Sequence, residues 1–340
     1  MLERISIKTY LENYSNIPIV DVRSPGEFLK GHIPGAHNIA LFTDEERAQV
    51  GTVYKQQSKE EAIELGYTFV NPKLKFFISE SKSIAPKKGI AIHCWRGGMR
   101  SQAFAEHLNE NGFEKVFVIE KGYKAFRNEV LSFFEQKFNL KILGGHTGSG
   151  KTDILANLIQ TGYQVVDLEG LANHKGSAFG GIGQCQQPTV EQFENNLFQQ
   201  LLNLNLQNPI WVEDESMNIG KVFIPKAFFV QMRQNRVYFI DIPRGERAKY
   251  LVKSYGIQNK EKLEEAILKV SKRLGPLNTK LAIEALNQNN FLKVAEISLI
   301  YYDKSYLIGL EKRDASLITK IEMDVVDAEI NTKKLLNYVS

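Results

Sequence analysis

The sequence predicts a two-domain α/β protein, with one domain over residues 1–137 and a second over residues 138–340 that ends in a helical region. Its 340 residues, 43% of them hydrophobic, suffice for two cores of ordinary size. In both halves short β-type runs alternate with helical periodicity, which is typical of a parallel sheet. From residue 244 onward the pattern turns almost entirely helical.

In the first half, short apolar runs predict strands at residues 17–22, 89–93 and 116–119. Residues 100–111 have helical periodicity. The polar helical stretch 44–83 is too long for a plain connection, so we expect extra helices there. An amphipathic helix over residues 123–138 should lead out of this domain.

The second half begins with a new apolar run at residues 140–143. Further strands are expected at 164–168, 210–213 and 237–242, with a helix over 189–204 between them. Beyond residue 244, charged helical faces precede a Leu- and Tyr-rich run at residues 291–306.

Composition excludes several classes of protein. We find no apolar run of the ~18 to 20 residues that a membrane span needs, and the N-terminus is charged, so we expect a cytoplasmic protein. Two cysteines, Cys94 and Cys185, are too few for a disulfide framework or a cysteine-built zinc site. The net charge of +4 permits an anionic partner such as RNA without requiring one.

The most specific motif is a P-loop that follows the strand at 140–143 and precedes a helical pattern. It consists of Gly145, His146, Thr147, Gly148, Ser149, Gly150, Lys151 and Thr152. Glycines allow successive backbone N–H groups to point at phosphate oxygens, lysine adds a positive charge, and threonine offers a hydroxyl to a metal ion. The motif therefore predicts phosphate binding.

Hydrolysis of a nucleotide would also need a metal-binding acid at the end of a neighbouring strand. Glu213 and Asp214, at the end of the strand at 210–213, could hold Mg²⁺ through water or could be solvated surface. The Gly-rich segment 174–183 suits a loop near a substrate. Cys185, in the same region, is interpreted as a passive thiol.

A second loop contains a cysteine that is a candidate for catalysis. Cys94 directly follows an apolar strand, and the residues after it combine glycines and arginines before a helix begins: Trp95, Arg96, Gly97, Gly98, Met99 and Arg100. Converging N–H groups, a helix N-terminus and the arginines lower a thiol pKa, so we expect a thiolate. Phosphoester hydrolysis and transfer of sulfur or selenium share this geometry.

Two further stretches, residues 20–28 and 31–39, together with Cys94 and its loop, resemble a rhodanese domain over most of residues 1–135. A rhodanese-like domain fused to a P-loop domain, with Cys-Trp-Arg-Gly-Gly-Met-Arg-Ser as its loop, resembles the tRNA 2-selenouridine synthase family. The expected fold is thus a rhodanese-like α/β domain followed by a P-loop NTPase-like parallel-sheet domain with a helical C-terminal region.

The resemblance implies a two-stage change at the wobble uridine of tRNA. A 2-thiouridine is geranylated from geranyl diphosphate, and the S-geranyl group is then replaced by selenium from selenophosphate, which gives 2-selenouridine. Cys94 would carry selenium, Arg100 would bind the donor's phosphate, and the P-loop would hold the diphosphate. Asp21, Arg23 and His32 are interpreted as structural.

Other functions remain open at this point. They are an ATP-dependent tRNA sulfurtransferase, a cysteine phosphatase or arsenate-type reductase with a nucleotide-binding domain, and a non-enzymatic anion sensor. Basic and aromatic residues of the helical region are candidates for contact with tRNA, with a solvated surface helix as the alternative for each of them. These residues are Lys272, Arg273, Lys293, Tyr301 and Tyr302.

Overall fold

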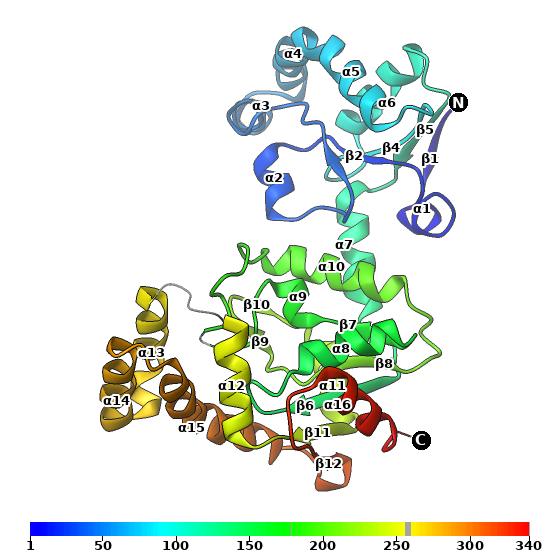
Figure 1. The fold of residues 1–340 in the computed structure, drawn as a ribbon. Coiled ribbons are helices and arrows are strands. Elements are labelled where there is room, and N and C mark those ends of the chain that lie inside the picture. The colour runs from blue at the N-terminus through cyan, green and yellow to red at the C-terminus, as the bar shows by residue number, and fades with distance from the viewer. Residues whose placement is uncertain (178, 256–259, 340) are drawn as a thin grey trace. The chain divides into compact units, whose positions relative to one another are not determined.

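The computed structural model describes residues 1–177, 179–255 and 260–339, and residue contacts divide the chain into two units, Met1–Phe133 and Phe134–Ser340 (Figure 1). Each unit has its own parallel sheet and its own buried apolar cluster. The predicted α/β class with a helical C-terminal region is confirmed. The boundary expected after residue 137 stays a prediction.

The sheet of the first unit joins five described strands in the order β1-β5-β4-β2-β3, and each neighbouring pair is parallel. The strands are β1 (Leu2–Ile5), β2 (Ile19–Asp21), β3 (His37–Asn38), β4 (Gly89–His93) and β5 (Lys115–Ile119). The sequence did not predict β1 and β3, because half of the residues of β1 are charged and β3 has only two residues, both polar. The buried strands β2 and β4 end beside each other, which places Asp21 opposite His93.

The described α-helices of this unit follow or precede its strands along the chain, and several begin at a Ser or Thr N-cap. They are α1 (Ile7–Asn13), α2 (Pro25–Lys30), α3 (Asp44–Gln56), α4 (Lys59–Val70), α5 (Leu74–Ile84), α6 (Met99–Glu110) and α7 (Gly122–Phe133). The expected helical insertion forms α3, α4 and α5, and α5 buries Phe77 against Phe104 of α6. Helix α6 packs on β4 and β5, directly after the Cys94 loop.

The helix predicted over residues 123–138 was too long, because α7 ends at Phe133. The next residues leave the helix and bury their rings in the second unit. Phe134 and Phe138 both contact Phe228 of α11 (Lys226–Gln234), and the Phe138 backbone N–H donates to Gln231. The stabilisation from burying these two rings and pairing the Phe138 N–H outweighs the preference of this segment for a helix.

The second sheet has the order β12-β11-β6-β8-β7, with all described neighbours parallel. Its strands are β6 (Leu140–Gly145), β7 (Gln164–Val166), β8 (Ile210–Glu213), β11 (Val237–Asp241) and β12 (Ile318–Glu322), and a separate hairpin pairs β9 (Asn218–Ile219) with β10 (Val222–Phe223). The prediction of an almost entirely helical chain after residue 244 was wrong at β12. This edge strand is short and polar, and only its pairing with β11 identifies it.

The remaining described helices belong to this unit. They are α8 (Lys151–Gln160), α9 (Leu168–Ala172), α10 (Val190–Leu202), α11, α12 (Arg244–Tyr255), α13 (Lys260–Leu274), α14 (Pro276–Asn287), α15 (Phe291–Leu310) and α16 (Ala328–Leu336). Helices α13, α14 and α15 pack on one another around their own apolar cluster, and α15 also packs on α12. In the described part of the chain, no helix combines the length and hydropathy that a membrane crossing requires.

Candidate functional site

The Cys94 loop is held by two glycines that no other residue could replace without strain. Gly97 has a φ of 60°, and a Cβ there would lie 2.3 Å from the carbonyl oxygen of Ile119. Gly122, with a φ of 53°, would place a Cβ 2.1 Å from the Cys94 carbonyl oxygen. The close approach lets the Tyr123 N–H donate to that carbonyl at 2.9 Å. These contacts therefore hold the loop in one conformation at the residue that carries the thiol.

The thiol itself is buried, with Cys94 only 3% exposed. Its Sγ lies 3.3 Å from Oγ of Ser101, in the first turns of α6. Burial alone would raise the pKa of the Cys94 thiol. The Ser101 hydroxyl, the charge of Arg100 and the backbone N–H groups of Ser101 and Arg96 together lower this pKa below its usual value. The arrangement favours a thiolate.

Of the two arginines in this loop, Arg100 is better placed to bind an anion, since its side chain is only 23% exposed. Its Nη1 lies 3.3 Å from Oε2 of Glu27, and Nε of Arg47 lies 3.6 Å from the same oxygen. Glu27 belongs to the capping box of α2. Arg96 is exposed. Two guanidinium groups thus share one carboxylate near the thiol, which suits transient binding of an anion.

At the end of β2, Asp21 and Arg23 form a buried ion pair. Arg23 donates to both carboxylate oxygens of Asp21 and to the Gly31 carbonyl oxygen, and its guanidinium carbon lies 3.8 Å from the centre of the Tyr123 ring. His32 stacks on Phe28. These contacts fit the structural role expected for Asp21, Arg23 and His32.

We expect Ser101→Ala to slow alkylation of Cys94 by iodoacetamide about tenfold at neutral pH, because a hydrogen bond to a charged group is lost. Because the native environment lowers the thiol pKa, reactivity is present above that pKa and declines as pH falls through it. Removal of the Ser101 hydroxyl should move the whole pH profile to higher pH. Rates would be measured in a Cys185→Ser background, since Cys185 is also free and exposed.

Ser83→Ala is the matched control for this experiment, because Ser83 is exposed and its hydroxyl donates only to the carbonyl oxygen of Glu80 in the described structure. Its pH profile should overlay that of the parent. Identical profiles for Ser101→Ala and the parent would show that Ser101 does not stabilise the thiolate.

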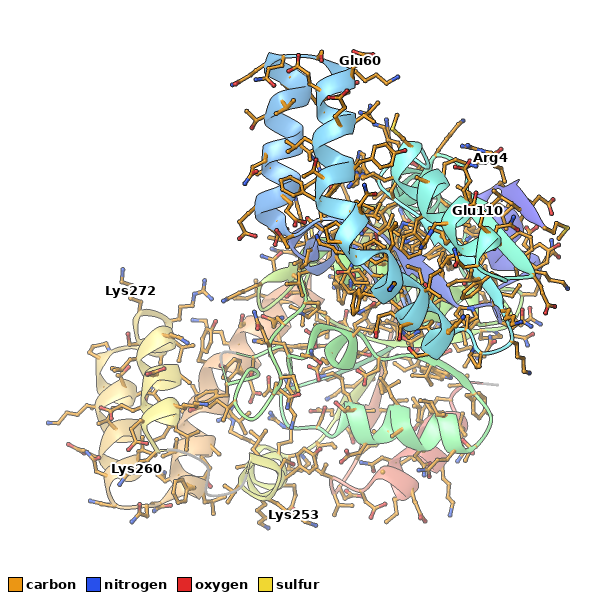
Figure 2. The ribbon with its side chains drawn as sticks, turned by 90° about the horizontal axis from the view of Figure 1, so that it is seen from above. Arg4, Glu60, Glu110, Lys253, Lys260 and Lys272 are labelled. Atoms are coloured by element: carbon orange, nitrogen blue, oxygen red, sulfur yellow. The ribbon has the colours of Figure 1, made fainter. Side chains whose placement is uncertain are left out.

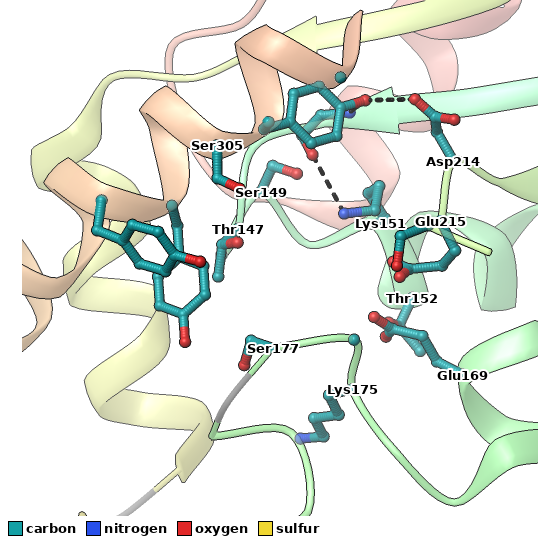
Figure 3. Close-up of a pocket in the computed structure, with 18 of the residues that line it drawn as sticks. Thr147, Ser149, Lys151, Thr152, Glu169, Lys175, Ser177, Asp214, Glu215 and Ser305 are labelled. Carbon is teal, nitrogen blue, oxygen red and sulfur yellow. Dashed lines mark hydrogen bonds between the residues drawn. The ribbon is translucent and has the colours of Figure 1, made fainter. Parts of the chain in front are cut away.

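In the second unit the P-loop connects β6 to α8, as expected. Gly148 and Gly150 have φ values of 80° and 75°, and a Cβ at Gly148 would lie 2.9 Å from a side-chain carbon of Leu251. Lys151 Nζ donates to the Gly145 carbonyl oxygen at 3.2 Å. The loop borders a cavity of about 1150 Å³ (Figure 3). Every P-loop residue from Gly145 to Thr152 except His146 lines it.

His146 instead lies below the loop. It is 7% exposed and its Nδ1 lies 3.5 Å from Oδ1 of Asp303, to which Arg247 donates at 2.8 Å. Burial lowers the pKa of His146, so the ring is neutral near pH 7. Arg247 also donates to the Thr147 carbonyl oxygen. His146 therefore lies against Asp303 of α15 and does not line the cavity, while Arg247 of α12 bonds both Asp303 and the P-loop.

The two acids predicted at the end of β8, Glu213 and Asp214, are engaged by other groups of the protein. Glu213 is 2% exposed and accepts a hydrogen bond from the Glu169 N–H at 2.7 Å. Burial, followed by the charges of Asp167 and Glu169, raises its pKa well above the usual value. Asp214 accepts from Tyr306 at 2.8 Å through one oxygen and from Arg313 through the other. Both oxygens of Asp214 are engaged by protein groups.

Two acids that sequence reasoning missed lie closer to the phosphate loop. Glu169 Oε2 accepts from the Thr152 hydroxyl at 3.3 Å, and Glu215 faces the same side of the cavity (Figure 3). Burial raises the pKa of Glu169, and burial together with Glu169 raises that of Glu215. Their positions just after β7 and β8, at the carboxyl edge of the sheet, are the signal that could have identified them. The described residues contain no cluster of three or more His, Cys, Asp or Glu arranged to hold a metal.

Other walls of the cavity come from the Gly-rich segment and the helical region. Lys175, Gly176 and Ser177 line it from the segment predicted at 174–183, of which residue 178 is outside the described residues. The expected tRNA contacts Lys272, Arg273, Tyr301 and Tyr302 also line it. Lys293 pairs with Glu296 elsewhere on α15. Figure 2 shows Lys272 pointing outward from the helical region.

The two units thus define an α/β protein that has one loop built around a thiol and, in the other unit, a P-loop that borders a cavity. Comparison with known families agrees with this division. Residues 6–129 match the rhodanese-like domain, and residues 138–335 match the tRNA 2-selenouridine synthase AAA domain.

Relatives match along much of the chain. A tRNA 2-selenouridine synthase of Bdellovibrio bacteriovorus is 34% identical over 90% of this chain and 92% of its own length, and one of Shewanella frigidimarina is 36% identical over 89% and 91%. One of Nitrosomonas europaea is 39% identical over 71% of this chain, and the match spans 64% of that relative, slightly under two thirds. The chain belongs to the tRNA 2-selenouridine synthase family, which consists of tRNA-modifying enzymes.

Proposed function

We propose that this enzyme converts the wobble 2-thiouridine of tRNA to 2-selenouridine in two stages, each with its own anion cradle. In the first stage the thiouridine sulfur bonds to C1 of geranyl diphosphate, the C1–O bond breaks, and pyrophosphate leaves. In the second stage the selenium of selenophosphate bonds to C2 of the base, the C2–S bond breaks and geranyl thiolate leaves, and water then breaks the Se–P bond to release phosphate. Alkylation makes sense chemically because it converts a poor leaving group into a good one.

The observation that carries this proposal is the presence of two cradles with different chemistry. The Cys94 cradle pairs a thiol of lowered pKa with Arg100, which suits binding of selenophosphate beside a nucleophilic thiolate. The P-loop cavity contains no cysteine among the described residues that line it, and Lys151 with the loop N–H groups suits a diphosphate. We therefore assign selenium transfer to the first cradle and geranylation to the second.

Mg²⁺ fits the second cradle only in part. The Thr152 hydroxyl and the Glu169 carboxylate are 3.3 Å apart and could hold it, while Asp214 is engaged by Arg313 and Tyr306. The ion would neutralise charge on the diphosphate. We place the work of the enzyme in the cytoplasm, where tRNA is modified, and we propose Lys272, Arg273, Tyr301 and Tyr302 as tRNA contacts.

Reconstitution with purified protein tests the proposal. With 2-thiouridine tRNA and geranyl diphosphate, mass analysis of the nucleosides should show the S-geranyl form, and addition of selenophosphate should convert it to the 2-seleno form. ATP should not be required. Selenium incorporation that depends on ATP hydrolysis and leaves no S-geranyl nucleoside would favour the sulfurtransferase-like alternative.

A further inference from the structure

A small apolar pocket opens directly beside the P-loop. Its volume is about 70 Å³. Four residues line both this pocket and the phosphate cavity, so the two spaces adjoin: Thr147, Ser177, Leu251 and Tyr302. The rest of the described lining is almost wholly apolar: Phe179, Val252, Leu263, Phe291, Val294, Ala295, Ser298 and Leu299. A phosphate on the P-loop would therefore have an apolar space next to it.

One face of α15 forms the floor of this pocket. Its lining residues recur at helical spacing, at positions 291, 294, 295, 298, 299 and 302. Most are large, but Ala295 and Ser298 are small and adjacent on the same face. Ser298 is 5% exposed and its hydroxyl has no partner among the described residues. An unpaired buried hydroxyl costs stability. We therefore attribute the presence of a serine here to its small size, which leaves space in the pocket.

The segment at 174–183 borders both spaces. Ser177 lines the phosphate cavity and the apolar pocket, while Phe179 lines the pocket alone. The Phe179 N–H donates to Oγ of Ser177 at 3.2 Å, and its ring centre lies 6.2 Å from that of Tyr302. One segment could thus contact the charged end and the apolar part of the same ligand.

We infer that this pocket holds the far end of the hydrocarbon chain of a prenyl diphosphate, and that Ala295 and Ser298 set the size of chain that fits. The inference rests on the proposed function and adds a place for the chain. A nucleotide base suits the pocket poorly, because the described lining has no acidic, basic or amide side chain to pair with its edge. Since an apolar cavity of about 150 Å³ binds benzene, a pocket of about 70 Å³ admits only the end of a short chain.

Binding competition with the full-length protein tests this inference. Inorganic pyrophosphate, geranyl diphosphate, farnesyl diphosphate and ADP would be compared by calorimetry. The parent should bind geranyl diphosphate at least about tenfold more tightly than pyrophosphate and more tightly than the longer farnesyl compound. Ser298→Phe, which fills the pocket, should lose this advantage and keep its affinity for pyrophosphate. Ala295→Leu is the second variant and should act in the same direction.

Ile300→Phe is the matched control, because Ile300 lies on the same helix and is 42% exposed. It should bind every ligand as the parent does. The inference is overturned if Ser298→Phe and Ala295→Leu bind geranyl diphosphate like the control, if they lose pyrophosphate equally, or if only ADP binding falls. A parent that binds neither diphosphate would contradict the proposed function itself, which is a separate result.

Discussion

Replacing Cys94 by alanine is expected to lower selenium incorporation at least about 10³-fold while S-geranyl tRNA accumulates. The magnitude is that of removing a nucleophile from an enzyme in which it forms a covalent intermediate. Geranylation should continue at the parental rate, because Cys94 belongs to the first unit and the P-loop to the second. The measurement is mass analysis of wobble nucleosides from the purified variant supplied with both donors.

Cys185→Ala is the matched control, since Cys185 is a free but exposed thiol. It should form the 2-seleno nucleoside at the parental rate. If Cys94→Ala still makes 2-selenouridine at that rate, selenium transfer does not need this thiol. If it loses geranylation as well, the two cradles do not act separately.

The two loops to which we assign these functions could be located from the sequence because their signals are local. A strand, a run of glycines with a cation and a helix start are contiguous in both, and Gly97 and Gly148 have the positive φ values that such turns require. The strands that hold the loops, β4 and β6, are apolar and central in their sheets. Buried central strands produce the clearest pattern in a sequence.

What the sequence could not predict depends on contacts between distant residues. Asp214 looked available for a metal, but Tyr306 and Arg313, 92 and 99 residues further along, engage both its oxygens. Tyr306 also accepts a hydrogen bond from the Gly145 N–H at 3.1 Å, which ties α15 to the start of the P-loop. No pattern within a short window of sequence reports such pairings.

The same limit explains the missed strand and the missed acids. Strand β12 has only two apolar residues among its five positions, without alternation, and its identity comes from its register with β11. Glu169 and Glu215 lie 46 positions apart and meet only because β7 and β8 are parallel neighbours. The apolar pocket beside the P-loop likewise combines residues of two loops with residues of three helices, α12, α13 and α15.

Replacing Lys151 by alanine is expected to reduce geranylation about 10²- to 10³-fold, because the variant loses a charged donor aimed at the leaving diphosphate. Selenium incorporation from geranyl diphosphate should fall equally, since its substrate no longer forms. When S-geranyl tRNA is supplied ready-made, however, the variant should convert it to the 2-seleno form as the parent does.

Lys249→Ala is the matched control, because Lys249 is exposed and pairs with Glu246 at the surface of α12. It should support both stages. A Lys151→Ala variant that geranylates normally but cannot use supplied S-geranyl tRNA would reverse the assignment, and the P-loop would then serve the selenium stage. Loss of both stages, with the thermal melting of the parent retained, would mean that the P-loop binds a group that both reactions need, such as the tRNA backbone.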